Sequence, residues 1–212
     1  MEFSRHGVML VIASPSGAGK SSITRRLLAD QNNLSMSVSV TTRKMRDGEV
    51  DGKDYHFVSM AEFETMREQG KLLEWAKVHS NYYGTPAAGV DKLIANGKDV
   101  VFDIDYQGTQ QLYEKRRAEM VSIFLLPPSI VELRQRLISR ALDSEEVINR
   151  RIKNARIEMG HWAEYDYVLV NDNLDETCDR VTKILETARI ARTRQTDLSK
   201  FIKGLQDQID SI

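Results

Sequence analysis

The chain has 212 residues, of which 41% are hydrophobic and 29% charged, a balance typical of one globular domain with a sizeable core. Its 30 Lys and Arg residues are matched by 31 Asp and Glu residues, which argues against nucleic acid or an anionic membrane as the main partner. One cysteine, Cys178, excludes an intrachain disulfide, and we expect it to be buried and inert in a helix. With no apolar run of membrane-spanning length, we expect a cytoplasmic protein.

The first predicted element is a buried strand over residues 8–13, followed by a loop of small residues and the start of a helix. The loop matches the phosphate-binding pattern G-x-x-x-x-G-K-[ST], except that Ser14 replaces the first glycine. In such a loop, backbone N–H groups surround the phosphates at a helix N-terminus. Lys20 is expected to reach the β- and γ-phosphates, and Ser21 to bind Mg²⁺. The predicted ATP-binding residues of this loop are Ser14, Pro15, Ser16, Gly17, Ala18, Gly19, Lys20, Ser21 and Ser22.

Between residues 35 and 78 the pattern changes to shorter, partly polar strands. Met36, Val38 and Val40 alternate with serines, which predicts one half-exposed strand, and a basic turn follows over residues 43–48. Helix starts are predicted by the capping-box patterns at residues 59–62 and 129–132.

Three further apolar runs, over residues 100–104, 121–126 and 167–170, are rich in Val, Ile and Leu, as in strands covered on both faces. Their alternation with helical segments predicts an α/β fold with a parallel sheet. Asp103 and Asp105 are expected to point to the same side at the end of one strand, where ligands of such sheets bind. Asp103 then orders Mg²⁺, although a loop or helix cap is the alternative for either residue.

Two helical segments complete the chain. Residues 134–151 are rich in arginine, and we expect Arg134 and Arg150 to lie on solvated helix faces. The final segment has apolar residues at helical spacing, which predicts a helix that packs back on its own domain, with a subunit contact as the alternative. These apolar residues are Leu198, Phe201, Ile202, Leu205 and Ile209.

Residues 37–49, 52–57, 73–76, 81–85 and 103–108 together resemble guanylate kinases, and the resemblance extends in unbroken order over residues 8–189. The strings include Ser37-Val-Ser-Val-Thr-Thr-Arg43, Asn81-Tyr-Tyr-Gly-Thr85 and Asp103-Ile-Asp-Tyr-Gln-Gly108. The resemblance implies Mg²⁺-dependent transfer of the ATP γ-phosphate to GMP. It also implies a P-loop NTPase-type core with helices on both faces, a GMP-binding region and a helical lid.

The resemblance assigns roles to residues that would otherwise look arbitrary. It implies that the GMP phosphate is held by Arg43, Arg46, Tyr55 and Tyr83, and guanine by Ser39, Glu74, Thr85 and Asp105. Its lid and core arginines correspond to Arg136, Arg140 and Arg151, which with Lys20 and Arg43 form the expected catalytic set. Asn171 resembles the contact on the adenine side. Ala141 stands where the family usually has glycine.

The expected organisation is one domain whose core comprises residues 1–37, 91–127 and 152–195. Residues 38–90 form the expected GMP-binding region, residues 128–151 the lid and residues 196–212 a helical extension. ATP and GMP are the expected partners, and self-association is an open possibility for the extension. The alternatives are a non-catalytic binding module of the same fold, or a P-loop kinase with another phosphorylated acceptor.

Overall fold

The central sheet of the computed structural model is parallel. The model describes residues 3–78, 80–139 and 144–212. Within them the sheet has five strands, in the order β2 (Leu34–Met36), β7 (Asp99–Phe102), β1 (Met9–Ala13), β8 (Met120–Leu126) and β9 (Tyr167–Val170). The expected parallel α/β core is therefore confirmed.

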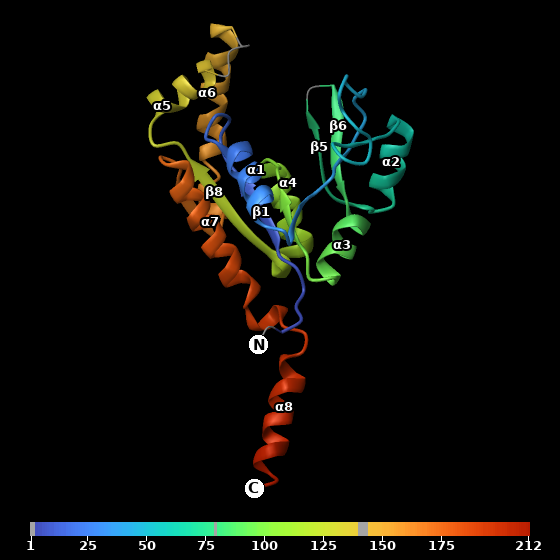
Figure 1. The fold of residues 1–212 in the computed structure, drawn as a ribbon. Coiled ribbons are helices and arrows are strands. Elements are labelled where there is room, and N and C mark those ends of the chain that lie inside the picture. The colour runs from blue at the N-terminus through green and yellow to red at the C-terminus, as the bar shows by residue number, and fades with distance from the viewer. Residues whose placement is uncertain (1–2, 79, 140–143) are drawn as a thin grey trace.

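Helices cover both faces of this sheet (Figure 1). The helices of the two faces are α1 (Lys20–Asp30) and α7 (Leu174–Arg189), then α3 (Ala87–Ala95) and α4 (Tyr106–Arg116). Successive residues of β1 point to opposite faces: Leu10 packs with Leu27 and Leu185, whereas Val11 packs with Leu112. The edge strand β9 differs, because most of its side chains are exposed, so the expectation that it is covered on both faces is wrong.

A second sheet stands to one side of the core (Figure 1). Among the described residues its order is β4 (His56–Phe57), β3 (Val40–Thr41), β6 (Asn81–Pro86) and β5 (Leu72–Val78), and it packs on α2 (Met60–Glu68) around Phe63. The single strand expected through Met36, Val38 and Val40 is wrong. The chain leaves the first sheet after Met36 and enters the second at Val40.

On the other side of the core stand α5 (Ile130–Ser139) and α6 (Glu145–Met159) (Figure 1). They share a small apolar core of Leu133, Leu137, Ile148 and Ala155. Arg134 forms an ion pair with Glu145 across the two helices, at 2.8 Å, and its side chain stays 43% exposed, on a solvated helix face as expected. Arg150 is exposed, as expected. Single 3-10 turns lie at η1 (Arg117–Glu119), η2 (Trp162–Glu164) and η3 (Arg192–Arg194).

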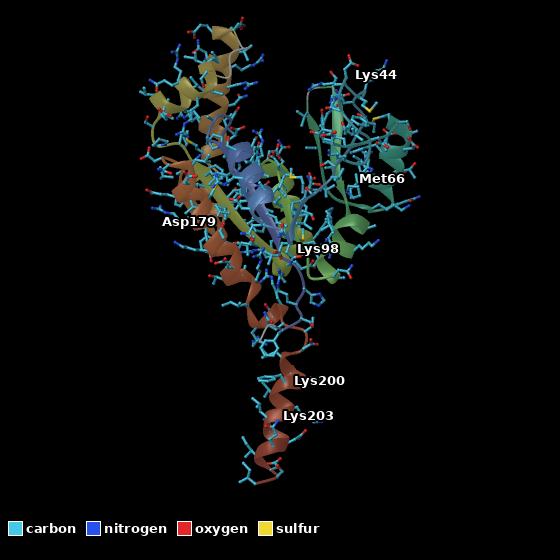
Figure 2. The ribbon with its side chains drawn as sticks, in the orientation of Figure 1. Lys44, Met66, Lys98, Asp179, Lys200 and Lys203 are labelled. Carbon is cyan, nitrogen blue, oxygen red and sulfur yellow. The ribbon has the colours of Figure 1, made fainter. Side chains whose placement is uncertain are left out.

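The last helix, α8 (Leu198–Ile209), projects away from the core (Figure 1). Figure 2 shows its Lys200 and Lys203 well clear of the rest of the chain. Along this helix the apolar side chains are partly or largely exposed, up to 68% at Ile209, so the prediction that it packs back on its own domain is wrong. No described helix is long and apolar enough to cross a membrane.

A buried carboxylate fixes the base of the core. Asp99 is fully buried and accepts hydrogen bonds from Val8 N (2.8 Å), Arg5 Nη1 (2.7 Å) and Arg189 Nε (2.7 Å). It therefore joins the segment before β1 to the start of β7 and the end of α7. Removing such a carboxylate leaves its buried partners unpaired.

We expect Asp99→Ala to lower the free energy of unfolding by about 3 kcal/mol or more, because two arginines and a backbone N–H lose their shared acceptor. Urea unfolding measures this change. The matched control is Asp179→Ala, whose carboxylate is exposed and which should change the free energy by about 0.5 kcal/mol or less. A loss below about 1 kcal/mol for Asp99→Ala would contradict the assigned role.

Candidate active site

The loop between β1 and α1 has the backbone geometry of an anion-binding turn. Gly17 and Gly19 adopt φ angles of 93° and 100°, a region that residues with a Cβ rarely enter. A Cβ on Gly19 would also lie 2.2 Å from Asn171 Nδ2. The Ser14 hydroxyl donates to Pro15 O at 3.0 Å, so the residue that departs from the usual glycine is accommodated within the loop.

Lys20 is the first residue of α1, and its ammonium contacts Asp103 Oδ1 at 2.5 Å and Ile104 O at 3.3 Å. A hollow of about 300 Å³ is lined by the loop, Ser21, Asp103, Asp105 and Glu158. Ser21 and Asp103 therefore present two oxygen ligands to the same space, and a few protein oxygens are what Mg²⁺ requires when phosphates and waters supply the rest. These residues fit the predicted metal.

Asp103 and Asp105 do not share a strand face, contrary to the prediction. Strand β7 ends at Phe102, and both carboxylates lie in the turn that follows. Asp105 caps α4 by accepting from Gly108 N at 3.0 Å. A helix cap was the alternative considered for this residue. Both acids nevertheless line the hollow beside Lys20.

A second hollow, of about 230 Å³, lies on the other side of the loop, between Gly19 and Arg136. The Asn171 amide is buried and donates to Ala18 O at 2.7 Å, which holds the loop in place. Arg136 donates to Asn171 O at 3.0 Å and to Glu132 Oε1 at 2.8 Å. The expected N-cap bond of α5, from Glu132 N to the Ser129 hydroxyl, is present at 3.0 Å.

Two further arginines were predicted to act in the lid or core, Arg151 and Arg140. Arg151 is half-buried on α6. Arg140 and the neighbouring Ala141 lie outside the described residues.

The basic turn of the second sheet is organised by Glu49, for which the sequence predicts no role. Arg43 donates to both Glu49 oxygens, at 3.0 and 2.7 Å, and Arg46 N donates to Glu49 Oε2 at 2.8 Å. The Arg43 guanidinium lowers the pKa of the Glu49 carboxyl. A paired carboxylate thus occupies the fork of Arg43, which is the geometry that a phosphate would require of it.

The structure gathers the other predicted phosphate ligands around Arg43. Its guanidinium lies 5.4 Å from the centre of the Tyr55 ring, and the rings of Tyr55 and Tyr83 are 5.9 Å apart. Burial is the main cause that raises the pKa of Tyr55. The nearby Tyr83 and the Asp103 carboxylate raise it further. Arg46 is exposed on the same turn.

Glu74 is a buried acid on β5, facing Thr85 on β6. Thr85 Oγ1 donates to Glu74 Oε1 at 2.6 Å. Burial raises the pKa of Glu74 to about 7, and the Asp105 charge adds to the rise while Lys115 and Thr85 oppose it. A Cβ on Gly108 would lie 2.9 Å from Glu74 Oε2, so a larger residue where α4 passes this carboxylate would have to displace it.

One further residue beside Glu74, Lys115, was not predicted from the sequence. Lys115 donates to the carbonyls of Leu72 and Leu73, at 3.1 and 2.8 Å, which binds α4 to β5 beside Glu74. In the sequence Lys115 is one of several charged residues in a helical segment, and no local pattern distinguishes it from the others. Ser39 is half-buried at the entry to the second sheet.

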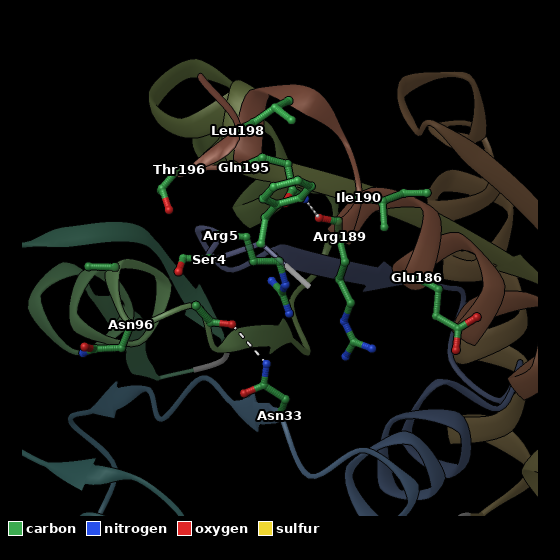
Figure 3. Close-up of a pocket in the computed structure, with 13 residues that line it drawn as sticks. Ser4, Arg5, Asn33, Asn96, Glu186, Arg189, Ile190, Gln195, Thr196 and Leu198 are labelled. Atoms are coloured by element: carbon green, nitrogen blue, oxygen red, sulfur yellow. Dashed lines mark hydrogen bonds between the residues drawn. The ribbon is translucent and has the colours of Figure 1, made fainter. Parts of the chain in front are cut away.

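A hollow of about 1100 Å³ lies at the opposite edge of the sheet, before the strands begin (Figure 3). It is lined by Asn33, Arg189, Ile190 and Leu198 among others, and it contains none of the predicted site residues. Size alone therefore does not identify the site. The chemistry is concentrated at the carboxyl ends of the strands, where open α/β sheets bind ligands.

Comparisons with known proteins agree with this geometry. The guanylate kinase family model matches residues 6–188. The guanylate kinase of Rhizobium meliloti is 54% identical over 205 residues, covering 97% of this chain and 94% of that protein. The guanylate kinase of Novosphingobium aromaticivorans is 54% identical over 201 residues, covering 95% and 91%.

Among solved structures, guanylate kinase from Anaplasma phagocytophilum superposes with a TM-score of 0.76 at 37% sequence identity, covering 95% of this chain and 96% of that one. Relatives with this identity and coverage, together with the family match, establish the family. The chain belongs to the guanylate kinase family and is a nucleoside monophosphate kinase.

Proposed function

We propose that the chain transfers the γ-phosphate of ATP to GMP, and also to dGMP, giving ADP and GDP. The observation that carries the proposal is the position of Asp105. Its carboxylate lines the hollow of the phosphate-binding loop, and it also lies close enough to the buried Glu74 to raise the pKa of that acid. Asp105 therefore borders both the site proposed for the phosphate donor and the carboxylate proposed to recognise guanine.

On the donor side, backbone N–H groups of residues 14–22 bind the triphosphate, and Lys20 neutralises charge at the phosphate that moves. Arg136, Arg140 and Arg151 add positive charge as the lid closes. Phosphoryl transfer needs positioning and charge stabilisation more than covalent chemistry, so no protein nucleophile is required. Asn171 contributes by bracing the loop.

Mg²⁺ would be held by Ser21 and Asp103. When bound, it would neutralise negative charge on the phosphates. Since Asp103 contacts Lys20 at 2.5 Å, the same carboxylate also orients the lysine.

On the acceptor side, Glu74 and Asp105 accept the N1–H and N2–H₂ donors of guanine. The Ser39 hydroxyl faces O6, and Thr85, whose hydroxyl proton is donated to Glu74, holds that carboxylate in place at the guanine site. Arg43, Arg46, Tyr55 and Tyr83 hold the GMP phosphate, which displaces Glu49 from Arg43. None of these residues is assigned to the ribose 2′-hydroxyl, which is why dGMP is included. Closure of residues 38–90 and 128–151 on the core then brings the two phosphates into line and excludes water.

ADP release in the presence of GMP, AMP, CMP or UMP tests the proposal. GMP should support ADP release. The kcat/KM for AMP should be lower by about 10⁴-fold, because AMP presents an acceptor at N1 and no amine at C2. A binding module would release ADP with none of the four. A kinase for another acceptor would prefer a different nucleotide.

GMP binding should also depend on pH. Guanine donors favour ionised Glu74, so below its empty-site pKa of about 7 each binding event must release a proton. The dissociation constant of guanosine, which lacks a titrating phosphate, should rise about tenfold per pH unit below pH 7 and be constant above pH 8. Calorimetry over pH 5.5–8.5 measures it, and a flat profile would contradict the assignment.

The division of the chain into core, GMP-binding region, lid and extension, its location in the cytoplasm and its self-association remain proposals. The exposed apolar side chains of α8 support the last of these.

A further inference from the structure

The two lid helices contact the phosphate-binding loop directly. From α5, Leu133 and Leu137 close over Gly17, where a Cβ would lie 3.0 and 3.1 Å from their side chains. From α6, Glu158 Oε2 accepts a hydrogen bond from Ser16 N at 3.2 Å. The loop is therefore held from both helices at once.

In the contact between Glu158 and Ser16 N, the carboxylate takes a position that a phosphate oxygen could occupy. Backbone N–H groups of such a loop serve to bind phosphate oxygens, and a carboxylate oxygen is an anion of the same kind. Glu158 is half-buried and lines the hollow shared by Lys20, Asp103 and Asp105. Burial raises the pKa of Glu158, Lys20 opposes the rise, and Asp105 adds to it. A phosphate that enters this hollow is therefore repelled by the negative charge of Glu158.

Glu158 is also mechanically connected to the lid. It lies in the last turn of α6, which runs without interruption from Glu145 to Met159. Ile148 and Ala155 on α6 pack with Leu133 and Leu137 on α5, so the two helices share one apolar core. Moving the end of α6 away from the loop therefore displaces both helices.

We propose that Glu158 is a positioning residue that occupies a phosphate-binding donor of the empty loop and is displaced by the triphosphate, so that nucleotide binding is coupled to movement of α5 and α6. The inference rests on the proposed function, because it presumes that the loop binds ATP. It adds a residue whose charge opposes the entry of the nucleotide phosphates.

Calorimetric titration of ATP with Mg²⁺ tests this coupling. Glu158→Gln keeps the side-chain size and an oxygen acceptor for Ser16 N but removes the charge. Because a triphosphate then enters without an opposing anion, ATP should bind about tenfold more tightly, and this gain should shrink at high salt. The KM for ATP should fall in parallel, while the KM for GMP stays within about twofold of wild type.

Two variants serve as controls. Glu146→Gln makes the same substitution at an exposed position in the first turn of α6 and should leave ATP affinity within about twofold. Glu158→Asp keeps the charge and should stay within about threefold of wild type. Should Glu158→Gln not fold, Glu158→Ala decides in the same titration, because it also removes the charge.

Unchanged ATP affinity in Glu158→Gln would overturn the proposal and make the contact a structural tie. Weaker ATP binding would overturn it as well, by showing that the carboxylate assists the bound nucleotide or its cation. A failure of the proposed function can be distinguished from these outcomes, because the wild-type protein itself would then bind no ATP in this titration.

Discussion

Lys20→Ala is expected to lower kcat for transfer by about 10³-fold or more. The Lys20 ammonium lies between the loop and Asp103, and losing a fixed positive charge at a transferring phosphate typically costs that much. GMP affinity should change little, because most residues assigned to GMP belong to the second sheet and its loops, and only Asp105, just before α4, also lines the hollow beside Lys20. Steady-state kinetics and GMP calorimetry on the same protein measure both quantities.

The matched control for this experiment is Lys203→Ala, on the part of α8 that stands clear of the core (Figure 2). It removes the same charge and should leave kcat within about twofold. Turnover of Lys20→Ala close to wild type would show that the loop does not carry the transferred phosphate in the way described.

Glu74→Gln is expected to reduce kcat/KM for GMP by about 10³-fold to 10⁵-fold. The amide oxygen can still accept from Thr85, but its NH₂ group then opposes the guanine donors in a buried site. Folding should survive, because the pKa of about 7 means that the uncharged acid, which glutamine resembles, is already well populated in the empty site. ATP affinity should be unchanged.

Kinetics with GMP as the varied substrate, and an ATP titration of the same variant, measure these effects. Glu64→Gln, on an exposed position of α2, is the matched control and should behave as wild type. GMP kinetics of Glu74→Gln within a few-fold of wild type would make Glu74 a structural residue and refute the guanine-reading scheme.

Features with a local signal were predictable from the sequence. The phosphate-binding loop follows from its glycines and Lys20 between a strand and a helix. The capping box at Ser59 and Glu62 is present with both of its hydrogen bonds, since all its partners lie within four residues. Glu74, which the family resemblance assigns to guanine, is the one acid in an apolar strand segment, and it is buried. Cys178 is buried in α7, as expected.

Features set by tertiary structure were not predictable in this way. Alternation through Met36 and Val40 is the same whether a strand continues or crosses to a second sheet. The sequence around Asp105 is compatible with a strand end and with a helix cap. Strand β7 ends at Phe102, and Asp105 is therefore the cap of α4. The amphipathic pattern of α8 does not specify what covers it. The contact between Glu158 and Ser16 joins residues far apart in the chain, so no local pattern marks it.

In the proposed reaction, one phosphate passes directly from ATP to GMP in a single site. Incubating the protein with Mg²⁺, GMP and ATP labelled in its γ-phosphate, then separating nucleotides, inorganic phosphate and protein, tests it most directly. Direct transfer should place the label in GDP, in amounts equal to the ADP formed, with none bound to protein and none released while GMP is absent. Label in inorganic phosphate, or covalently attached to the protein, would contradict it.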